Sequence, residues 1–183
     1  DGRVHPARVE EQVAKARREV DEVVQKAGEE ALFDANVKGL HPELVKIAGR
    51  LKFRYSYGEN VLRHSVEVSL LAGMMAAEIG ANVERAKVAG FLHDIGKALT
   101  HEVDGPHAEI GADVAVKNRI SAPVCTAIRE HHDDDHTSVE SFIVAAADAT
   151  ESADETDATS QASLPLVDGE GDPLAAATTY AVQ

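Results

Sequence analysis

The chain has 183 residues and carries 18 Lys and Arg against 32 Asp and Glu, a formal net charge of −14. Ala, Val, Leu and Ile supply most of its apolar residues, and aromatics make up only 4%, which favours packed helices over a sheet. The single cysteine, Cys125, excludes an internal disulfide and a cysteine-based zinc site, and it suits a reducing, cytoplasmic setting. No apolar run approaches the length of a bilayer span, and the N-terminus is unlike a signal peptide.

The acidity is concentrated at the C-terminal end. Residues 1–63 hold 12 basic and 11 acidic side chains, whereas residues 131–183 hold 12 acidic and no Lys or Arg. The first part could therefore approach a polyanion, and the last part would repel one. Because the chain starts with Asp1 and not Met, we expect it to be an excised piece of a longer protein.

A long amphipathic helix is predicted at the start, from Pro6 to about Phe33. Proline suits the first helical position, and small apolar residues recur at three- and four-residue steps: Val9, Val13, Ala16, Val20, Val23, Ala27 and Ala31. We expect a surface or coiled-coil helix that positions the rest of the chain. Residues 1–37 thus form an N-terminal helical element, and a break at residues 38–42 ends it.

Residues 38–149 are expected to fold as one all-α domain. No alternating strand pattern and no internal repeat is present, and residues 55–58 read as a turn. The last helix should start at the cap Ser138 and bury Val139, Phe142, Ile143 and Ala146. The predicted helices are residues 42–53, 61–79, 83–92, 107–116, 122–132 and 138–149. Residues 150–183 are rich in Ser, Thr, Ala and Asp without an apolar period, and we expect an acidic, mostly disordered tail.

Histidines and aspartates at the ends of these helices predict a metal site. Imidazole and carboxylate ligands suit Mn²⁺, Fe²⁺, Zn²⁺ or Mg²⁺, and a bound metal supplies hydroxide near neutral pH and neutralises charge on a phosphoryl oxygen. Hydrolysis of a phosphate ester is the chemistry that both effects serve. The four candidate ligands are His64, His93, Asp94 and Asp148.

Three further histidines, His107, His131 and His132, offer more nitrogen. They could complete a second metal site with Asp94 as a bridge, contact the scissile phosphate, or donate a proton to the leaving oxygen. Lys97 lies one helical turn after His93 and could face a phosphate as a point charge, so we name Asp94 and Lys97 as candidate catalytic residues.

Each of these histidines has a simpler explanation, because a lone histidine on an apolar helix face is usually a hydrogen-bonded core residue. The ordered set from His64 to Asp148 is hard to explain as packing. Other candidates are weaker: we expect Asp133, Asp134 and Asp135 to be solvated charge and Cys125 to be a small core residue. His101 and His136 are outside candidates for the site.

At these residues the sequence resembles the HD superfamily of metal-dependent phosphohydrolases, and within it the ribonuclease Y family of bacterial endoribonucleases. His64, the pair His93-Asp94, and Asp148 match the defining series of the superfamily. The stretches that resemble ribonuclease Y are DGRVHPARVEE at residues 1–11, LKFRYSYGENVL at 51–62 with HSVEV at 64–68, GFLHDIGKA at 90–98 and HAEIG at 107–111. The resemblance covers residues 1 to about 149.

The resemblance implies an all-helical HD-domain bundle, a divalent metal (Mn²⁺ or Mg²⁺ first, then Zn²⁺ or Fe²⁺), and single-stranded RNA or mRNA as substrate, with a cut that starts mRNA decay. It also implies a homodimer or oligomer. Full-length members carry a KH domain and an N-terminal anchor to the bacterial cell membrane; neither is in this chain, so we expect this piece to be cytoplasmic.

After Asp148 the sequence departs from the family, which continues into a basic stretch. Here Thr150-Glu151-Ser152-Ala153-Asp154 follows instead. Two other functions therefore stay open at this point: an HD-type phosphohydrolase acting on nucleotides or cyclic dinucleotides, and a catalytically impaired helical module for dimerisation or other interactions.

Overall fold

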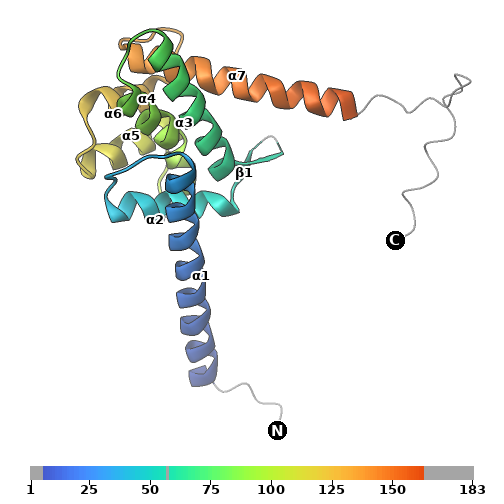
Figure 1. Cartoon of the computed structure of the whole chain (residues 1–183). Coiled ribbons are helices and arrows are strands. Elements are labelled where there is room, and N and C mark those ends of the chain that lie inside the picture. Colours follow the sequence, from blue (N-terminus) through green and yellow to red (C-terminus); the bar gives the residue numbers. More distant parts are fainter. Residues whose placement is uncertain (1–5, 57, 163–183) are drawn as a thin grey trace, which may run out of the picture. The chain divides into compact units, whose positions relative to one another are not determined.

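The computed structural model describes residues 6–56 and 58–162, and most of them are helical (Figure 1). The α-helices are α1 (Pro6–Asp34), α2 (Pro42–Arg50), α3 (Val61–Glu78), α4 (Val83–Leu92), α5 (His107–Lys117), α6 (Ala122–Glu130) and α7 (Val139–Ala162), and the 3₁₀ turns are η1 (Leu51–Phe53) and η2 (Ile95–Ala98). This confirms the all-α prediction. No described helix is both long and apolar enough to span a bilayer.

A small hairpin occupies the segment expected to be a turn. Strands β1 (Tyr55–Ser56) and β2 (Glu59–Asn60) pair antiparallel, with Tyr55 opposite Asn60. The side chain of Asn60 then accepts hydrogen bonds from the Leu62 and Arg63 amides and caps the start of α3. The hairpin therefore fixes where α3 begins, one turn before His64.

Helix α4 lies in the middle of the bundle, packed against α3 and α6. Phe91, Leu92 and Ile95 are fully buried, and they surround His93 and Asp94, which are each only 1% exposed. The histidine–aspartate pair is therefore held inside the hydrophobic core and not on its surface. Burial of such polar groups is unfavourable unless partners compensate for it, so the residues around this pair decide what it does.

The last helix is longer than predicted. We expected an end at Ala149, but α7 continues to Ala162. The physical reason is local, because no glycine or proline occurs between Pro123 and Pro165 to stop a helix of Ala, Ser, Thr and acidic residues. The described chain divides into two units after Ala149. Residues 163–183 of the expected acidic tail lie outside the described part of the chain.

Candidate metal centre

Two buried histidines occupy equivalent places at the ends of two helices. His93 is the C-cap of α4 and His131 is the C-cap of α6. The Nδ1 atom of each lies 2.7 Å from the carbonyl oxygen three residues earlier, Gly90 and Ile128 respectively. Because a carbonyl only accepts, Nδ1 must donate in both rings, and in the neutral ring Nε2 keeps its lone pair. Each helix end therefore presents a metal-ligand nitrogen.

His64 reaches this region from the first turn of α3. A Cβ at Gly90 would lie 3.0 Å from both the Ser69 Cα and the Val68 carbonyl oxygen, so a glycine lets α4 approach α3 this closely. Ser69 Oγ strengthens the contact by donating to the Lys87 carbonyl at 2.8 Å. As a result, the Nε2 atoms of His64 and His93 lie only 3.2 Å apart.

The carboxylates complete this first group. Asp148 Oδ1 lies 3.1 Å from His64 Nε2 and 3.7 Å from His93 Nε2. Asp94 Oδ2 lies 3.5 Å from His93 Nε2 and 4.0 Å from His64 Nε2. The structure thus brings together all four residues that the sequence singled out as ligands, although their binding of a metal stays a prediction.

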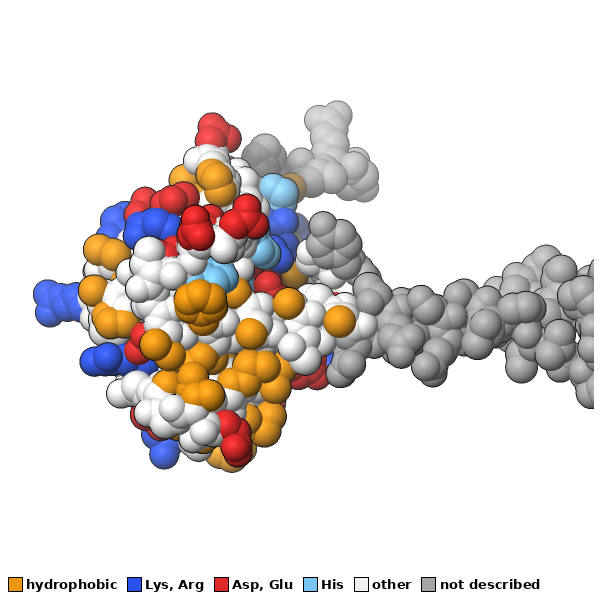
Figure 2. All heavy atoms as spheres, turned by 90° about the horizontal axis from the view of Figure 1, so that it is seen from above, with side chains coloured by type: hydrophobic (Ala, Val, Ile, Leu, Met, Phe, Trp, Pro, Cys, Tyr) orange, Lys and Arg blue, Asp and Glu red, His pale blue; other side chains and the backbone are white. Residues whose placement is uncertain are grey.

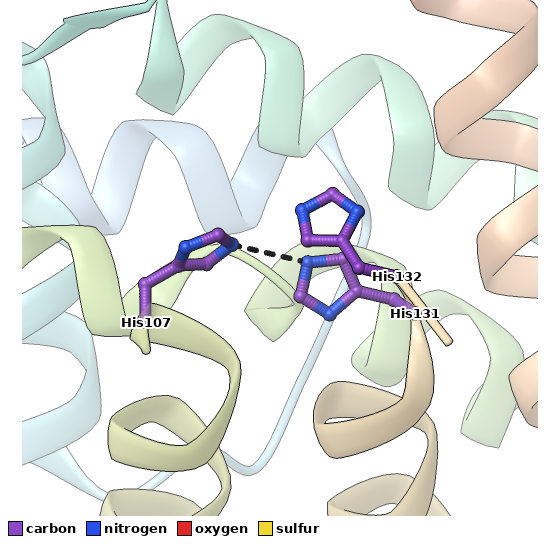
Figure 3. A group of neighbouring side chains, drawn as sticks. All are labelled: His107, His131 and His132. Carbon is purple, nitrogen blue, oxygen red and sulfur yellow. Dashed lines mark hydrogen bonds between the residues drawn. The ribbon is translucent and has the colours of Figure 1, made fainter. Parts of the chain in front are cut away.

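A second group of imidazoles lies on the other oxygen of Asp94. His107 Nε2 is 3.2 Å and His131 Nε2 is 3.9 Å from Asp94 Oδ1, and the two nitrogens are 3.3 Å apart (Figure 3). Gly96 makes this possible, because a Cβ there would lie 1.9 Å from the His107 carbonyl oxygen. The start of α5 can therefore pack directly on η2. Asp94 lies between two pairs of histidines, which is the position required of a bridging ligand.

His132 and Lys97 have different surroundings. The His132 ring is exposed, and its centroid is 4.0 Å from that of His131 and 5.1 Å from that of His107. Its ring nitrogens can join those of His107 and His131 in one group within 4.8 Å. The Lys97 ammonium donates to Asp94 Oδ2 at 2.6 Å. Lys97 is therefore paired with the central carboxylate, and its side chain is 26% exposed.

The electrostatics of the site favour the neutral form of its two buried histidines and the ionised form of its two aspartates. Burial lowers the pKa of His93, and burial together with His93 lowers the pKa of His131 to about 3. Burial alone would raise the pKa of Asp94, but His93, His107 and Lys97 outweigh it and hold this pKa well below its usual value. The pKa of Asp148 is lowered in the same way. Burial alone would raise it, but the hydrogen bond with His64 and the electrostatic interaction with His93 lower it to about 2.

These donors fit a divalent cation. Metals bind neutral imidazole and ionised carboxylate, which are the forms favoured for His93, His131 and the two aspartates. Asp94 Oδ1 is buried, and within the described part of the chain no donor makes a hydrogen bond of good geometry to this oxygen, although His107 Nε2 lies 3.2 Å away. A cation bound there would satisfy it. The site also has access to solvent, because His64, His107 and Asp148 are only partly buried; on the face in Figure 2, histidine side chains reach the surface beside acidic ones.

Sequence patterns missed the supporting contacts of the site. The carbonyls of Gly90 and Ile128 orient two imidazoles, yet any residue could supply a carbonyl, so residue type carries no signal there. A positional signal does exist: in both cases a histidine directly follows the last residue of a helix and is itself followed by a second possible metal ligand, His93-Asp94 and His131-His132. Such a pair at a helix end can bond back to the last turn.

Comparison with known proteins identifies the domain. Residues 61–153 match the HD domain family. Over 154 residues the chain is 58% identical to the ribonuclease Y proteins of Thermoanaerobacter pseudethanolicus and Geobacillus thermodenitrificans, and 55% identical to that of Bacillus subtilis; these matches cover 84% of this chain. The chain spans only 30% of the length of these relatives.

A solved structure supports the fold. The crystal structure of a predicted HD superfamily hydrolase from an uncultured Thermotogales bacterium matches with a TM-score of 0.53 and 24% identity, covering 65% of this chain and 74% of that one. The family match covers half of the chain and includes all four residues of the first group. The chain therefore belongs to the HD-domain family.

Proposed function

We propose that this chain is the HD-domain part of a metal-dependent phosphodiesterase, an endoribonuclease of the ribonuclease Y type that cleaves single-stranded RNA and starts mRNA decay. One observation carries the proposal: four histidine Nε2 atoms gather around the two oxygens of a single buried carboxylate, Asp94. The similarity to ribonuclease Y over 84% of the chain supports RNA as the substrate.

In this proposal, His64, His93, Asp94 and Asp148 would hold one cation, and His107, His131 and Asp94 would hold a second, with His132 at its edge. Bound metals lower the pKa of water and neutralise charge on the phosphodiester oxygens. Nitrogen-rich surroundings suit Mn²⁺, Fe²⁺ or Zn²⁺ better than Mg²⁺, which prefers oxygen ligands. The site also supplies carboxylate oxygens, which suit Mn²⁺, so we propose Mn²⁺ first.

Other groups of the chain orient the ligand imidazoles and exclude water from part of the site. The Gly90 and Ile128 carbonyls fix the His93 and His131 rings so that Nε2 faces Asp94. The apolar residues Phe91, Leu92 and Ile95 keep water away from the back of the site. Lys97 is the nearest ammonium to Asp94, and a substrate phosphate close to this carboxylate would be within its influence.

The test uses the 183-residue chain, its metal content, and two substrates: a small chromogenic phosphodiester and a labelled single-stranded RNA, each with Mn²⁺ or Mg²⁺. Replacing Asp94 by Asn removes the negative charge between the two pairs of histidines at nearly constant shape, so hydrolysis of both should fall at least about 100-fold. Lys117→Gln, at the far end of α5 roughly 15 Å from His107, is the matched control and should not change either rate.

Other outcomes favour the alternatives. Equal rates for Asp94→Asn and the parent would contradict the metal-centre mechanism. Hydrolysis of nucleotides or cyclic dinucleotides without RNA cleavage would support a nucleotide phosphohydrolase. A stable, metal-free chain that cleaves neither substrate would support an interaction module.

We further infer that the chain self-associates through α1. Val9, Val13, Val20 and Val23 are 44–53% exposed, and their spacing continues the three- and four-residue steps of a coiled coil. Val13→Glu with Val20→Glu should convert a dimer into a monomer in light scattering, whereas a monomeric parent would contradict this inference. The cytoplasmic setting expected from the sequence stays a prediction.

A further inference from the structure

Basic and aromatic side chains alternate on the surface just before α3. Lys52 and Phe53 lie in η1, Arg54 directly follows this turn, and Tyr55 begins β1. Phe53 is 57% exposed and Tyr55 is 73% exposed, although a ring of this size would normally gain about 1.5–3 kcal/mol from burial. Neither ring is therefore used to stabilise the described fold.

Hydrogen bonds hold the backbone of this segment in place. The Asn60 side-chain amide donates to the Lys52 carbonyl at 2.7 Å and to the Arg54 carbonyl at 3.5 Å, and the Val61 amide donates to the Arg54 carbonyl at 3.0 Å. Asn60 is also the cap of α3, four residues before His64. The alternating segment is thus fixed to the helix that carries a candidate ligand; Figure 1 shows β1 at the start of α3.

The positive charges of this segment are not neutralised. Among the described residues, neither Lys52 nor Arg54 forms an ion pair with a carboxylate, whereas Arg50, one helical turn earlier, is paired with Glu102. Arg54 instead donates to His101 Nε2 at 2.6 Å. A guanidinium has five N–H donors, so Arg54 keeps donors available for a further acceptor.

The segment also borders the metal centre from a second direction. Turn η1 contacts η2, the turn that carries Lys97. His101, the partner of Arg54, lies four residues after Lys97. A strand of nucleic acid lying on Lys52–Tyr55 would therefore be close to the groups around Asp94.

We propose that Lys52, Phe53, Arg54 and Tyr55, together with His101, form the surface that binds single-stranded RNA beside the metal centre. The rings stack on successive unpaired bases, and Lys52 and Arg54 contact the backbone phosphates; this combination is typical of proteins that bind single strands with little sequence preference. The choice of RNA rests on the proposed function. Specificity for single strands follows from the surface itself, because stacking on a ring requires an unpaired base.

The test is binding of a fluorescently labelled single-stranded RNA to the 183-residue chain in EDTA, where no metal-dependent cleavage occurs. Phe53→Ala and Tyr55→Ala should each weaken binding by roughly five-fold or more. Lys52→Gln and Arg54→Gln should each reduce the slope of log K against log salt by about 0.7, the value for one phosphate contact on a single strand. The matched controls, Phe33→Ala for an exposed ring and Lys117→Gln for an exposed charge, should change neither quantity.

Three results would overturn the proposal: equal affinity of parent and variants, equal affinity for duplex and single strand, or ring variants that change the oligomeric state and not RNA binding. Circular dichroism and thermal unfolding show whether each variant folds, and the salt slope separates a lost phosphate contact from a structural effect. Hydrolysis of the small phosphodiester by the parent reports on the metal centre alone. RNA binding without hydrolysis would therefore contradict the proposed function but support the binding surface.

Discussion

Acid should destabilise the metal-free protein through its buried histidines. His131 has a folded-state pKa of about 3 against an ordinary value of 6.5, because it is buried next to His93. Between pH 6.5 and 3 the imidazole is therefore protonated in the unfolded chain but neutral in the folded chain. The free energy of unfolding is highest above pH 6.5 and decreases as the pH falls toward 3. The full difference corresponds to about 5 kcal/mol, of which about 3 kcal/mol is lost by pH 4.5.

The window between pH 6.5 and 4.5 isolates the imidazoles. Asp94 and Asp148 also have lowered pKa values, but their contribution disappears only below the ordinary aspartate value of 3.8. The pKa of His93 is lowered as well, so it acts in the same direction as His131. A domain with a typical stability of about 5–15 kcal/mol would lose a large part of it.

Urea unfolding followed by circular dichroism, in EDTA at several pH values, measures this loss. His131→Asn cannot titrate, and its amide can still donate to the Ile128 carbonyl, so the slope between pH 6.5 and 4.5 should become clearly smaller. Lys117→Gln, an exposed position at the end of α5, is the control, and this variant should keep the slope of the parent. An unchanged slope in His131→Asn would refute the reasoning.

Three further predictions concern the same centre. Mn²⁺ at about 100 times its Kd should raise the free energy of unfolding by about 2.7 kcal/mol. An unchanged melting temperature on addition of Mn²⁺ in thermal shift measurements would contradict metal binding. Gly96→Ala should destabilise the domain by roughly 1–3 kcal/mol in urea and weaken Mn²⁺ binding in calorimetry, because the new Cβ would lie 1.9 Å from the His107 carbonyl oxygen and push α5 away. Lys97→Gln removes a cation that shares Asp94 Oδ2, so Mn²⁺ should bind at least as tightly while turnover of the small diester falls about tenfold or more; unchanged turnover would exclude Lys97 from the reaction.

Local features of the sequence are sufficient to predict most helices. Periodic apolar residues, caps such as Ser138, and the stop at Gly80 act through neighbours a few residues away, so they can be recognised without a fold. Residue type alone also indicates which side chains can bind a metal. The order of His64, His93, Asp94 and Asp148 in the chain was therefore enough to expect a metal and to recognise a family.

Which face of a helix is buried depends on its partners. On α7 we expected Val139, Phe142, Ile143 and Ala146 to be buried; the structure buries Ile143, Val144 and Ala147, and leaves Val139 and Phe142 more than half exposed. That prediction was partly wrong because it scored hydrophobicity alone. The observed face places Asp148, which directly follows Ala147, beside His64.

The sequence alone determined which residues could bind a metal, because ligand chemistry belongs to each side chain. Only the tertiary structure decided that Asp94 lies between two pairs of imidazoles, that Lys97 shares its carboxylate, and that Nε2 is the nitrogen presented by His93 and His131. These arrangements depend on close helix contacts at Gly90 and Gly96 and on backbone carbonyls. Contacts between residues far apart in the chain arise from packing, and no local pattern specifies them.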